Sequence, residues 1–219
     1  MDRSIALPVA VATLAVQIGL GWHPEADRFT WAMENVPVWI GLALLFNYRN
    51  KFPLSNLCIA LLGIHGLILA VGGHYTYAKV PLGDWAAATF HLARNPYDRL
   101  GHLAQGFIPA ILVRELILRT SPVRKGKLLA FICITTCMGF SAFYEFIEWW
   151  TALATGEAAE DFLGTQGDPW DTQWDMFMAT LGASLALLTL SRAHDRSLAQ
   201  LASLTPHASP APQPSSQKP

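Results

Sequence analysis

Residues 52–78 of the chain read FPLSNLCIALLGIHGLILAVGGHYTYA and contain no Asp, Glu, Lys or Arg. A helix needs about 17 to 25 mostly apolar residues to cross the hydrocarbon core of a bilayer. This stretch is long enough, and it lacks the charged face that a helix on a soluble domain presents to water. The sequence therefore predicts a transmembrane helix over residues 54–73.

Five more charge-poor stretches lie before and after this one in the chain. The chain of 219 residues is 52% hydrophobic and only 14% charged, against about 25% charged in typical soluble domains. The second predicted span is the shortest and contains Pro37, which removes a backbone hydrogen bond and favours a kink. The predicted fold is all-α, a polytopic membrane helical bundle of about six transmembrane helices. The spans are residues 5–22, 31–46, 54–73, 96–118, 128–150 and 169–191.

Charged residues are distributed unevenly between the two sides of this predicted bundle. With six spans both termini lie on one side, and that side collects 11 of the 15 basic residues. The other side collects most of the acidic residues and seven of the eight Trp residues, which favour the headgroup interface. By the positive-inside rule, the N and C termini are both predicted to be cytoplasmic. The net charge of −1 provides no basic surface, so we expect the lipid bilayer as a partner and no nucleic acid.

The chain is predicted to form one membrane domain followed by a tail. Residues 1–196 form the transmembrane helical domain. Residues 197–219 are expected to be a disordered cytoplasmic tail, because residues 207–219 are rich in Pro, Ser, Ala and Gln. Between the third and fourth spans, residues 85–93 are expected to lie in the outer interface as a short helix.

Acidic and histidine side chains gather at the predicted outer ends of four spans. Ionisable groups at membrane depth are costly and usually serve a function. Several of these residues are separated by three or four positions, so each pair lies on one helix face. The residues concerned are His74, Asp98, His102, Glu145, Glu148, Asp171 and Asp175.

This combination of side chains predicts a metal site. Carboxylates beside Phe and Trp need a compensating charge, and mixed carboxylate and imidazole ligands suit a divalent Zn, Mn or Fe ion. Glu148 is predicted to be the general base that activates water, and Arg99 to steady an anionic group of the substrate. The predicted metal ligands are His74, Asp98, His102, Glu145, Asp171 and Asp175.

Two simpler interpretations remain open for the same residues. Asp98 and Asp171 both fall in the first turn of a predicted helix, where an acidic side chain favours the positive end of the helix dipole. The whole group could also be a structural ion-pair network in which Arg94 and Arg99 neutralise the carboxylates.

Four segments around these residues carry a family resemblance. They are residues 72–85 (GGHYTYAKVPLGDW), 95–107 (NPYDRLGHLAQGF), 141–150 (SAFYEFIEWW) and 164–176 (GTQGDPWDTQWDM). Together they closely resemble the uncharacterised bacterial inner-membrane family typified by the enterobacterial YjdF membrane protein. The resemblance implies a helical bundle in the bacterial inner (cytoplasmic) membrane and no established activity.

A more distant likeness is to VanZ-type proteins. These pair an Asp-x-x-x-His helix start with a later Glu and a helix that carries Asp-x-x-x-x-x-x-Gly. Asp98 and His102, Glu145, and Asp175 with Gly182 look similar. That family is linked to glycopeptide resistance at the cell surface, but Glu148 and the Trp-rich loops of this chain depart from its pattern.

Three functional hypotheses follow from the sequence. The first is a metal-dependent hydrolase or transferase that acts at the outer face on a lipid or lipid-linked envelope substrate. The second is a transporter of divalent cations or small solutes that uses the same cluster as its external site. The third is a membrane scaffold without catalytic activity, in which the polar cluster is structural.

Overall fold

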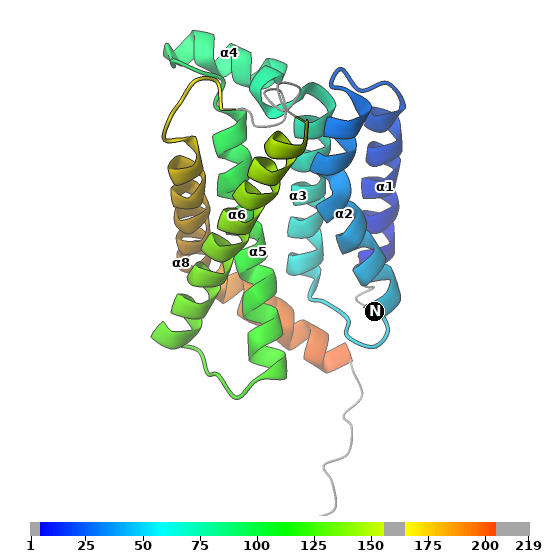
Figure 1. Ribbon diagram of the computed structural model, residues 1–219. Helices are drawn as coiled ribbons and strands as arrows, with labels where there is room; N and C mark the ends of the chain where they lie inside the picture. The colour runs from blue at the N-terminus through cyan, green and yellow to red at the C-terminus, as the bar shows by residue number, and fades with distance from the viewer. Residues whose placement is uncertain (1–4, 156–164, 205–219) are drawn as a thin grey trace, which may run out of the picture.

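The structure is a computed structural model that describes residues 5–155 and 165–204. All regular structure in these residues is helical (Figure 1). Six long helices run side by side, and the short helix α4 lies across one end of them, which we call the α4 end. The elements are α1 (Ala6–Trp22), α2 (Arg28–Tyr48), α3 (Asn56–Tyr75), the 3-10 turn η1 (Tyr77–Lys79), α4 (Pro81–Phe90), α5 (Tyr97–Thr120), α6 (Lys127–Thr155) and α8 (Asp171–Leu204).

The predicted all-α membrane bundle is confirmed. Helices α2, α3, α5, α6 and α8 are each long and apolar enough to cross a membrane. Helix α1 has 17 residues, which is at the lower limit for a full crossing, and it packs against α3 and α2. Each of the six predicted spans therefore corresponds to one helix of the bundle.

Helix α2 is longer than the sequence predicts. The side chain of Asp27 accepts hydrogen bonds from the backbone N–H groups of Phe29 (2.8 Å) and Thr30 (3.0 Å), and this cap starts the helix at Arg28. The helix continues past Pro37 to Tyr48. The first turn thus lies outside the apolar stretch on which the prediction of residues 31–46 was based.

The short helix at the α4 end begins earlier than expected. It covers Pro81–Phe90 and ends at His91, whose φ of 55° is left-handed. Proline at its first turn is favourable because the missing N–H would have no helical partner there. The side chains of Trp85 and Phe90 are 61% and 65% exposed, so this helix presents large apolar rings on its surface.

The predicted boundary between the membrane domain and the tail is placed too early. Helix α8 continues to Leu204, and its last part, orange in Figure 1, crosses beneath the bundle at the end opposite α4. The hydroxyl of Ser197 accepts a hydrogen bond from the backbone N–H of Leu57 (3.2 Å), so this part is fixed to the start of α3. Residues 197–204 are therefore helical, and residues 205–219, the rest of the predicted tail, lie outside the described residues.

Helices α5 and α8 make the most extensive contact among the described helices. A Cβ atom on Gly106 would overlap the carbonyl oxygen of Ala179, and one on Gly182 would overlap the carbonyl oxygen of Leu103. Small residues allow helix backbones to approach closely in this way. The contact fixes the position of the α8 side chains relative to those of α5 at the α4 end.

Candidate metal centre at the α4 end

His102 lies at the centre of the polar cluster. Its Nε2 atom is 3.7 Å from Oδ1 of Asp98, 3.9 Å from Oε1 of Glu145 and 3.9 Å from Oδ2 of Asp175. These residues come from three helices, α5, α6 and α8, so the tertiary structure brings them together. All four residues are buried.

Some carboxylate oxygen atoms of this cluster have no hydrogen-bond partner among the described residues. Asp98 accepts a hydrogen bond from Arg94 through Oδ2 (3.2 Å), and Glu145 accepts one from Thr172 through Oε2 (2.8 Å). Oε1 of Glu145 and Oδ1 of Asp175 are buried and have no hydrogen-bond partner among the described residues. Glu145 is only 9% exposed and Asp175 only 3% exposed. A buried oxygen left without a partner is costly unless a ligand supplies one.

The spacing of these atoms is close to that of a metal site. Atoms of Asp98, His102 and Asp175 lie within 4.8 Å of one another, and so do atoms of His102, Glu145 and Glu148. Ligands about 2.1 Å from a tetrahedral ion would be about 3.4 Å apart. The 3.7–3.9 Å separations around His102 would close to that distance by small side-chain movements. The predicted ligands Asp98, His102, Glu145 and Asp175 are therefore grouped in the structure.

Ser141 orients the histidine ring. Its hydroxyl lies 3.3 Å from Nδ1 of His102 and is fully buried on α6. Metal-binding histidines usually engage their second ring nitrogen in this way, which fixes the ring and leaves the other nitrogen for the ion. Ser141 was not predicted as a site residue, because a Ser in a membrane helix is common and its partner lies on another helix.

Arg94 is the principal cation beside the cluster. It forms ion pairs with Asp171 and Asp98 and donates a hydrogen bond to the backbone oxygen of Thr165 (3.2 Å). Burial alone would lower the pKa of Arg94, but the hydrogen bond and charge of Asp171, with the charge of Asp98, raise it above its usual value. Arg94 therefore remains charged, and this part of the cluster matches the ion-pair interpretation.

Three of the predicted site residues have their partners outside the group of carboxylates around His102. Nδ1 of His74 lies 2.8 Å from the carbonyl oxygen of Leu20, so His74 contacts the end of α1 and belongs to neither ligand group. Arg99 forms an ion pair with Asp168 (2.8 Å), and its guanidinium stacks over the ring of Trp174 at 4.9 Å. The third, Asp171, is paired with the guanidinium of Arg94, as described above.

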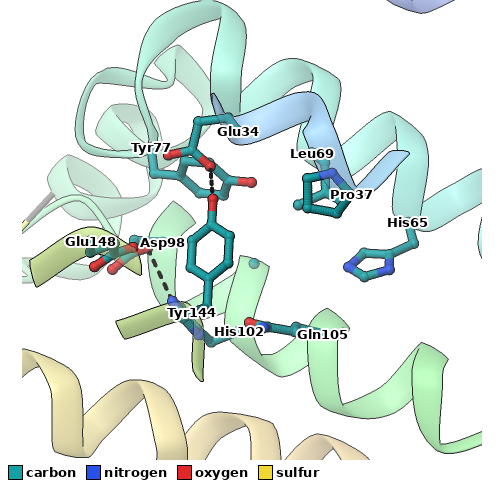
Figure 2. Close-up of a pocket in the computed structure, with 11 residues that line it drawn as sticks. Glu34, Pro37, His65, Leu69, Tyr77, Asp98, His102, Gln105, Tyr144 and Glu148 are labelled. Atoms are coloured by element: carbon teal, nitrogen blue, oxygen red, sulfur yellow. Dashed lines mark hydrogen bonds and ion pairs between the residues drawn. The ribbon is translucent and has the colours of Figure 1, made fainter. Parts of the chain in front are cut away.

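A cavity extends from the cluster into the bundle, and Figure 2 shows the side chains around it. Glu34 of α2 points into this cavity and accepts a hydrogen bond from the hydroxyl of Tyr144 (2.8 Å). Glu34 is only 4% exposed and was not predicted as a site residue. The signal was present, because an acidic residue inside the predicted span 31–46 is itself an indication of function.

Tyr77 closes the α4 end of the same cavity. Its ring fits against α3 and α5 where glycine leaves space, since a Cβ on Gly72 or Gly101 would overlap it. Burial raises the pKa of the Tyr77 hydroxyl well above its usual range, and the nearby charge of Glu34 raises it further. The hydroxyl therefore stays protonated and is available as a hydrogen-bond donor.

A second polar cluster at the opposite end of the bundle provides a contrast. The carboxylate of Glu115 is completely buried and accepts hydrogen bonds from the N–H (2.8 Å) and hydroxyl (2.6 Å) of Ser55. Arg119 donates to it at 2.8 Å, and Nε2 of His194 lies 3.1 Å from it. Both oxygens of Glu115 thus have partners, which is typical of a structural network, whereas the cluster around His102 leaves oxygens unpaired.

Comparisons with known proteins place the chain in a family. Residues 5–196 match the family described as "Predicted membrane protein (DUF2238)". The chain is also 45% identical over 197 residues to Inner membrane protein YjdF of Escherichia coli (strain K12), a match that covers 90% of this chain and 93% of that protein. No solved structure gave a significant match. The resemblance carried by the four motif segments is thus confirmed, and the chain is a multi-pass inner-membrane protein that belongs to the DUF2238 family, together with YjdF.

Proposed function

We propose that the protein is a metal-dependent hydrolase or transferase that acts at the outer face of the membrane on a lipid or lipid-linked envelope substrate. One observation carries the proposal. Nε2 of His102 faces oxygen atoms of three carboxylates from three helices, at 3.7–3.9 Å, and two buried carboxylate oxygens of the group have no partner among the described residues. A divalent cation would supply the missing charge and the missing bonds together.

In this proposal the ligands are Asp98, His102, Glu145 and Asp175. Because three of the four donors are carboxylates, Mn is favoured over Zn and Fe among the ions considered. A bound divalent ion makes water acidic enough to be a nucleophile at neutral pH. Glu148 lies one helical turn from Glu145 and shares a ligand group with it and His102, which suits a general base for that water.

A cleft between α6 and α8 supports a lipid substrate. It opens directly beside Glu145 and Glu148, and the rings of Phe146 and Trp149 form part of its wall. These two rings are 51% and 56% exposed on the surface that faces the bilayer in a membrane-spanning bundle. A substrate with a polar headgroup and a hydrocarbon part would meet both kinds of surface at once.

Metal analysis of the purified protein tests the proposal first. We expect about one Mn, Zn or Fe per chain in the wild type and loss of that metal in Glu145→Gln. Glu25→Gln, on the exposed connection between α1 and α2, is the matched control and should keep the metal. Metal-free wild-type protein under chelator-free conditions, with a folded Glu145→Gln variant, would contradict the proposal.

The proposed base requires a separate variant. Glu148→Gln should keep the metal but fail to restore the lipid and cell-wall profile of a deletion strain, since losing a general base typically costs about 10²- to 10⁴-fold in rate. Expression of Glu25→Gln should restore that profile. A deletion strain with an unchanged lipid and cell-wall profile in metal-replete medium would count against an envelope substrate.

One observation favours transport as a second candidate. The cavity of Figure 2 continues from His102 past Gln105 to His65, in the middle of α3. A cation transporter needs such polar groups at depth. Beyond His65, however, the adjoining cavity is lined mainly by apolar side chains. Metal flux into proteoliposomes that disappears in Glu145→Gln would favour this alternative.

A further inference from the structure

The cleft between α6 and α8 is large enough to hold a small ligand. Its volume is about 350 Å³, and small-molecule sites in proteins usually measure roughly 300 to 1,000 Å³. Side chains of α6 form one wall, and the start of α8 with Thr165, in the connection before it, forms the other. The chemistry of these walls therefore indicates which kind of group the cleft can bind.

The polar wall of the cleft is acidic. Glu145, Glu148 and Asp171 line it, together with the hydroxyl residues Thr165 and Thr172. No Lys, Arg or His is among the described residues that line the cleft. An anionic group would meet like charges here at short range, whereas a cationic group would be attracted.

Two of these carboxylates have bonding capacity left for a ligand. Oε1 of Glu145, a residue only 9% exposed, is buried and has no hydrogen-bond partner among the described residues. The carboxylate of Glu148 has neither an ion pair nor a hydrogen bond within the part of the chain that the structure describes, and it lies beside that of Asp98 (Figure 2). Polar groups that are left without partners in a buried setting indicate that a ligand supplies them.

One divalent ion does not neutralise the acidic groups at this end of the bundle. The carboxylates are those of Asp98, Glu145, Glu148, Asp171 and Asp175. Arg94 and, in the proposed function, one divalent ion oppose these five charges, so a formal charge of −2 remains with all groups ionised. Arg99 is paired with Asp168 and does not alter this count. A ligand with a positive charge would therefore stabilise the site.

Exposed aromatic rings form the rest of the wall. Trp149 and Phe146 line the cleft and are 56% and 51% exposed. The face of an aromatic ring, of Trp above all, attracts organic cations such as ammonium groups, whereas hard inorganic cations use oxygen ligands. Carboxylates beside an exposed Trp thus suit an organic ammonium group.

We infer that the cleft between α6 and α8 binds the ammonium group of an amine-bearing lipid headgroup, held by Trp149 and the acidic wall. The anionic phosphate of such a headgroup would face the metal ion. Because Trp149 and Phe146 are exposed on the surface that faces the bilayer, a lipid is favoured over a water-soluble amine as the source. The inference rests on the proposed function for the reaction, and it adds the chemical class of the headgroup.

Calorimetric titration with short-chain lipids tests the inference. The full-length protein in mild detergent is titrated with dihexanoyl phosphatidylethanolamine, dihexanoyl phosphatidylglycerol and free ethanolamine. The two lipids have the same chains, and only the first carries an amine. We expect the phosphatidylethanolamine to bind about tenfold or more tightly than the phosphatidylglycerol. Equal affinities for the two lipids would overturn the inference, and free ethanolamine that binds as tightly as the lipid would overturn the lipid as the source of the amine.

A pair of tryptophan variants locates the site. Trp149→Leu keeps an apolar side chain in the cleft but removes the aromatic face, and it should weaken binding of the phosphatidylethanolamine about fivefold or more. Trp150→Leu is the matched control, because Trp150 is the next residue of α6, is 51% exposed and does not line the cleft. Equal affinities of the two variants for this lipid would overturn the inference.

A variant that fills the cleft gives a second test that does not depend on the folding of Trp149→Leu. Ala152 lines the cleft, so Ala152→Trp should abolish the preference for the phosphatidylethanolamine. Ala154→Trp is its control, because Ala154 is exposed on the same helix and does not line the cleft. A preference that persists in Ala152→Trp would place the amine elsewhere and overturn the inference.

Metal content separates this result from the fate of the proposed function. Trp149→Leu should retain wild-type metal, since Trp149 belongs to neither ligand group. A preference for the phosphatidylethanolamine that Trp149→Leu removes, in a protein without metal, would support the ammonium site and refute the metal-dependent function. Bound metal without any preference between the two lipids would refute the ammonium site alone.

Discussion

Ser141 contributes to the candidate site through one contact, between its hydroxyl and the ring of His102. Its hydroxyl lies 3.3 Å from Nδ1 of His102 and holds the ring with Nε2 toward the carboxylates. Without this contact the buried ring would lose one of the partners that fix its orientation, and a ligand that must first be oriented binds more weakly. The role of Ser141 is therefore to position His102.

We expect Ser141→Ala to weaken metal binding about 10- to 100-fold while the protein stays folded. Competition with a chelator of known affinity measures the change. Ser184→Ala is a suitable control, because the hydroxyl of Ser184 donates its hydrogen bond to the carbonyl oxygen of Thr180, one turn earlier in α8. Unchanged metal affinity in Ser141→Ala would show that other packing contacts orient the His102 ring.

At the scale of elements, the start of α2 depends on a single side chain. Asp27 accepts hydrogen bonds from two backbone N–H groups and from the hydroxyl of Thr30 (2.5 Å). Burial alone would raise the pKa of Asp27, but its hydrogen bonds with Thr30 and Phe29 lower it below its usual value. The first turn of α2 leads directly to Glu34, so this cap also helps to position one wall of the polar cavity.

Asp27→Ala should lower the free energy of unfolding by about 1 kcal/mol, the usual value for loss of an N-cap. Folding lowers the pKa of Asp27 below its value in the unfolded chain, which is about 4. The Asp27 carboxylate therefore contributes fully to the free energy of unfolding above that unfolded pKa, and the contribution is lost as the pH falls through the lower, folded-state pKa. Thermal unfolding in detergent at neutral and acidic pH measures both effects. Glu25→Ala, in the same connection, is the control; an equal loss of stability in it would argue against capping.

At the scale of the whole molecule, the contact between α5 and α8 determines whether the site exists. Asp98 and His102 lie on α5 and Asp175 lies on α8, and the two glycines that let these helices touch are Gly106 and Gly182. The atoms that a new Cβ would meet belong to backbone, which cannot move aside as a flexible side chain does. Separation of the helices would therefore carry Asp175 away from His102.

We expect Gly182→Ala to destabilise the protein by about 1–3 kcal/mol, as overpacking usually does, and to reduce metal content as well. Thermal unfolding and elemental analysis of one purified sample measure the two effects. Gly139→Ala serves as the control, because its Cβ would meet nothing within 4 Å, and alanine is the better helix former. A Gly182→Ala protein with normal stability and metal content would show that the close contact is not needed.

Hydrophobicity and charge alone determined the membrane class, the all-helical fold and the position of every long helix to within a few residues at most ends. The physical reason is that a bilayer requires long apolar helices whose backbone hydrogen bonds are made within the helix. Each such helix can be recognised from its own stretch of sequence, without knowledge of the rest of the fold. The observed helix ends differ from the predicted ones where a capping side chain or a contact with a distant residue extends the helix. Asp27 did so for α2, and Ser197, through its bond to Leu57, marks the same extension in α8.

The candidate site was predictable only as a set of residues at one end of the bundle. Spacing placed Asp98 with His102 and Glu145 with Glu148 on shared faces, because a helix repeats every 3.6 residues. Only the tertiary structure decided that His74 turns to Leu20, that Asp171 pairs with Arg94, and that Glu34 joins the cavity. The direction of each side chain toward another helix depends on how the helices pack together, and the periodicity of a single helix does not contain that information.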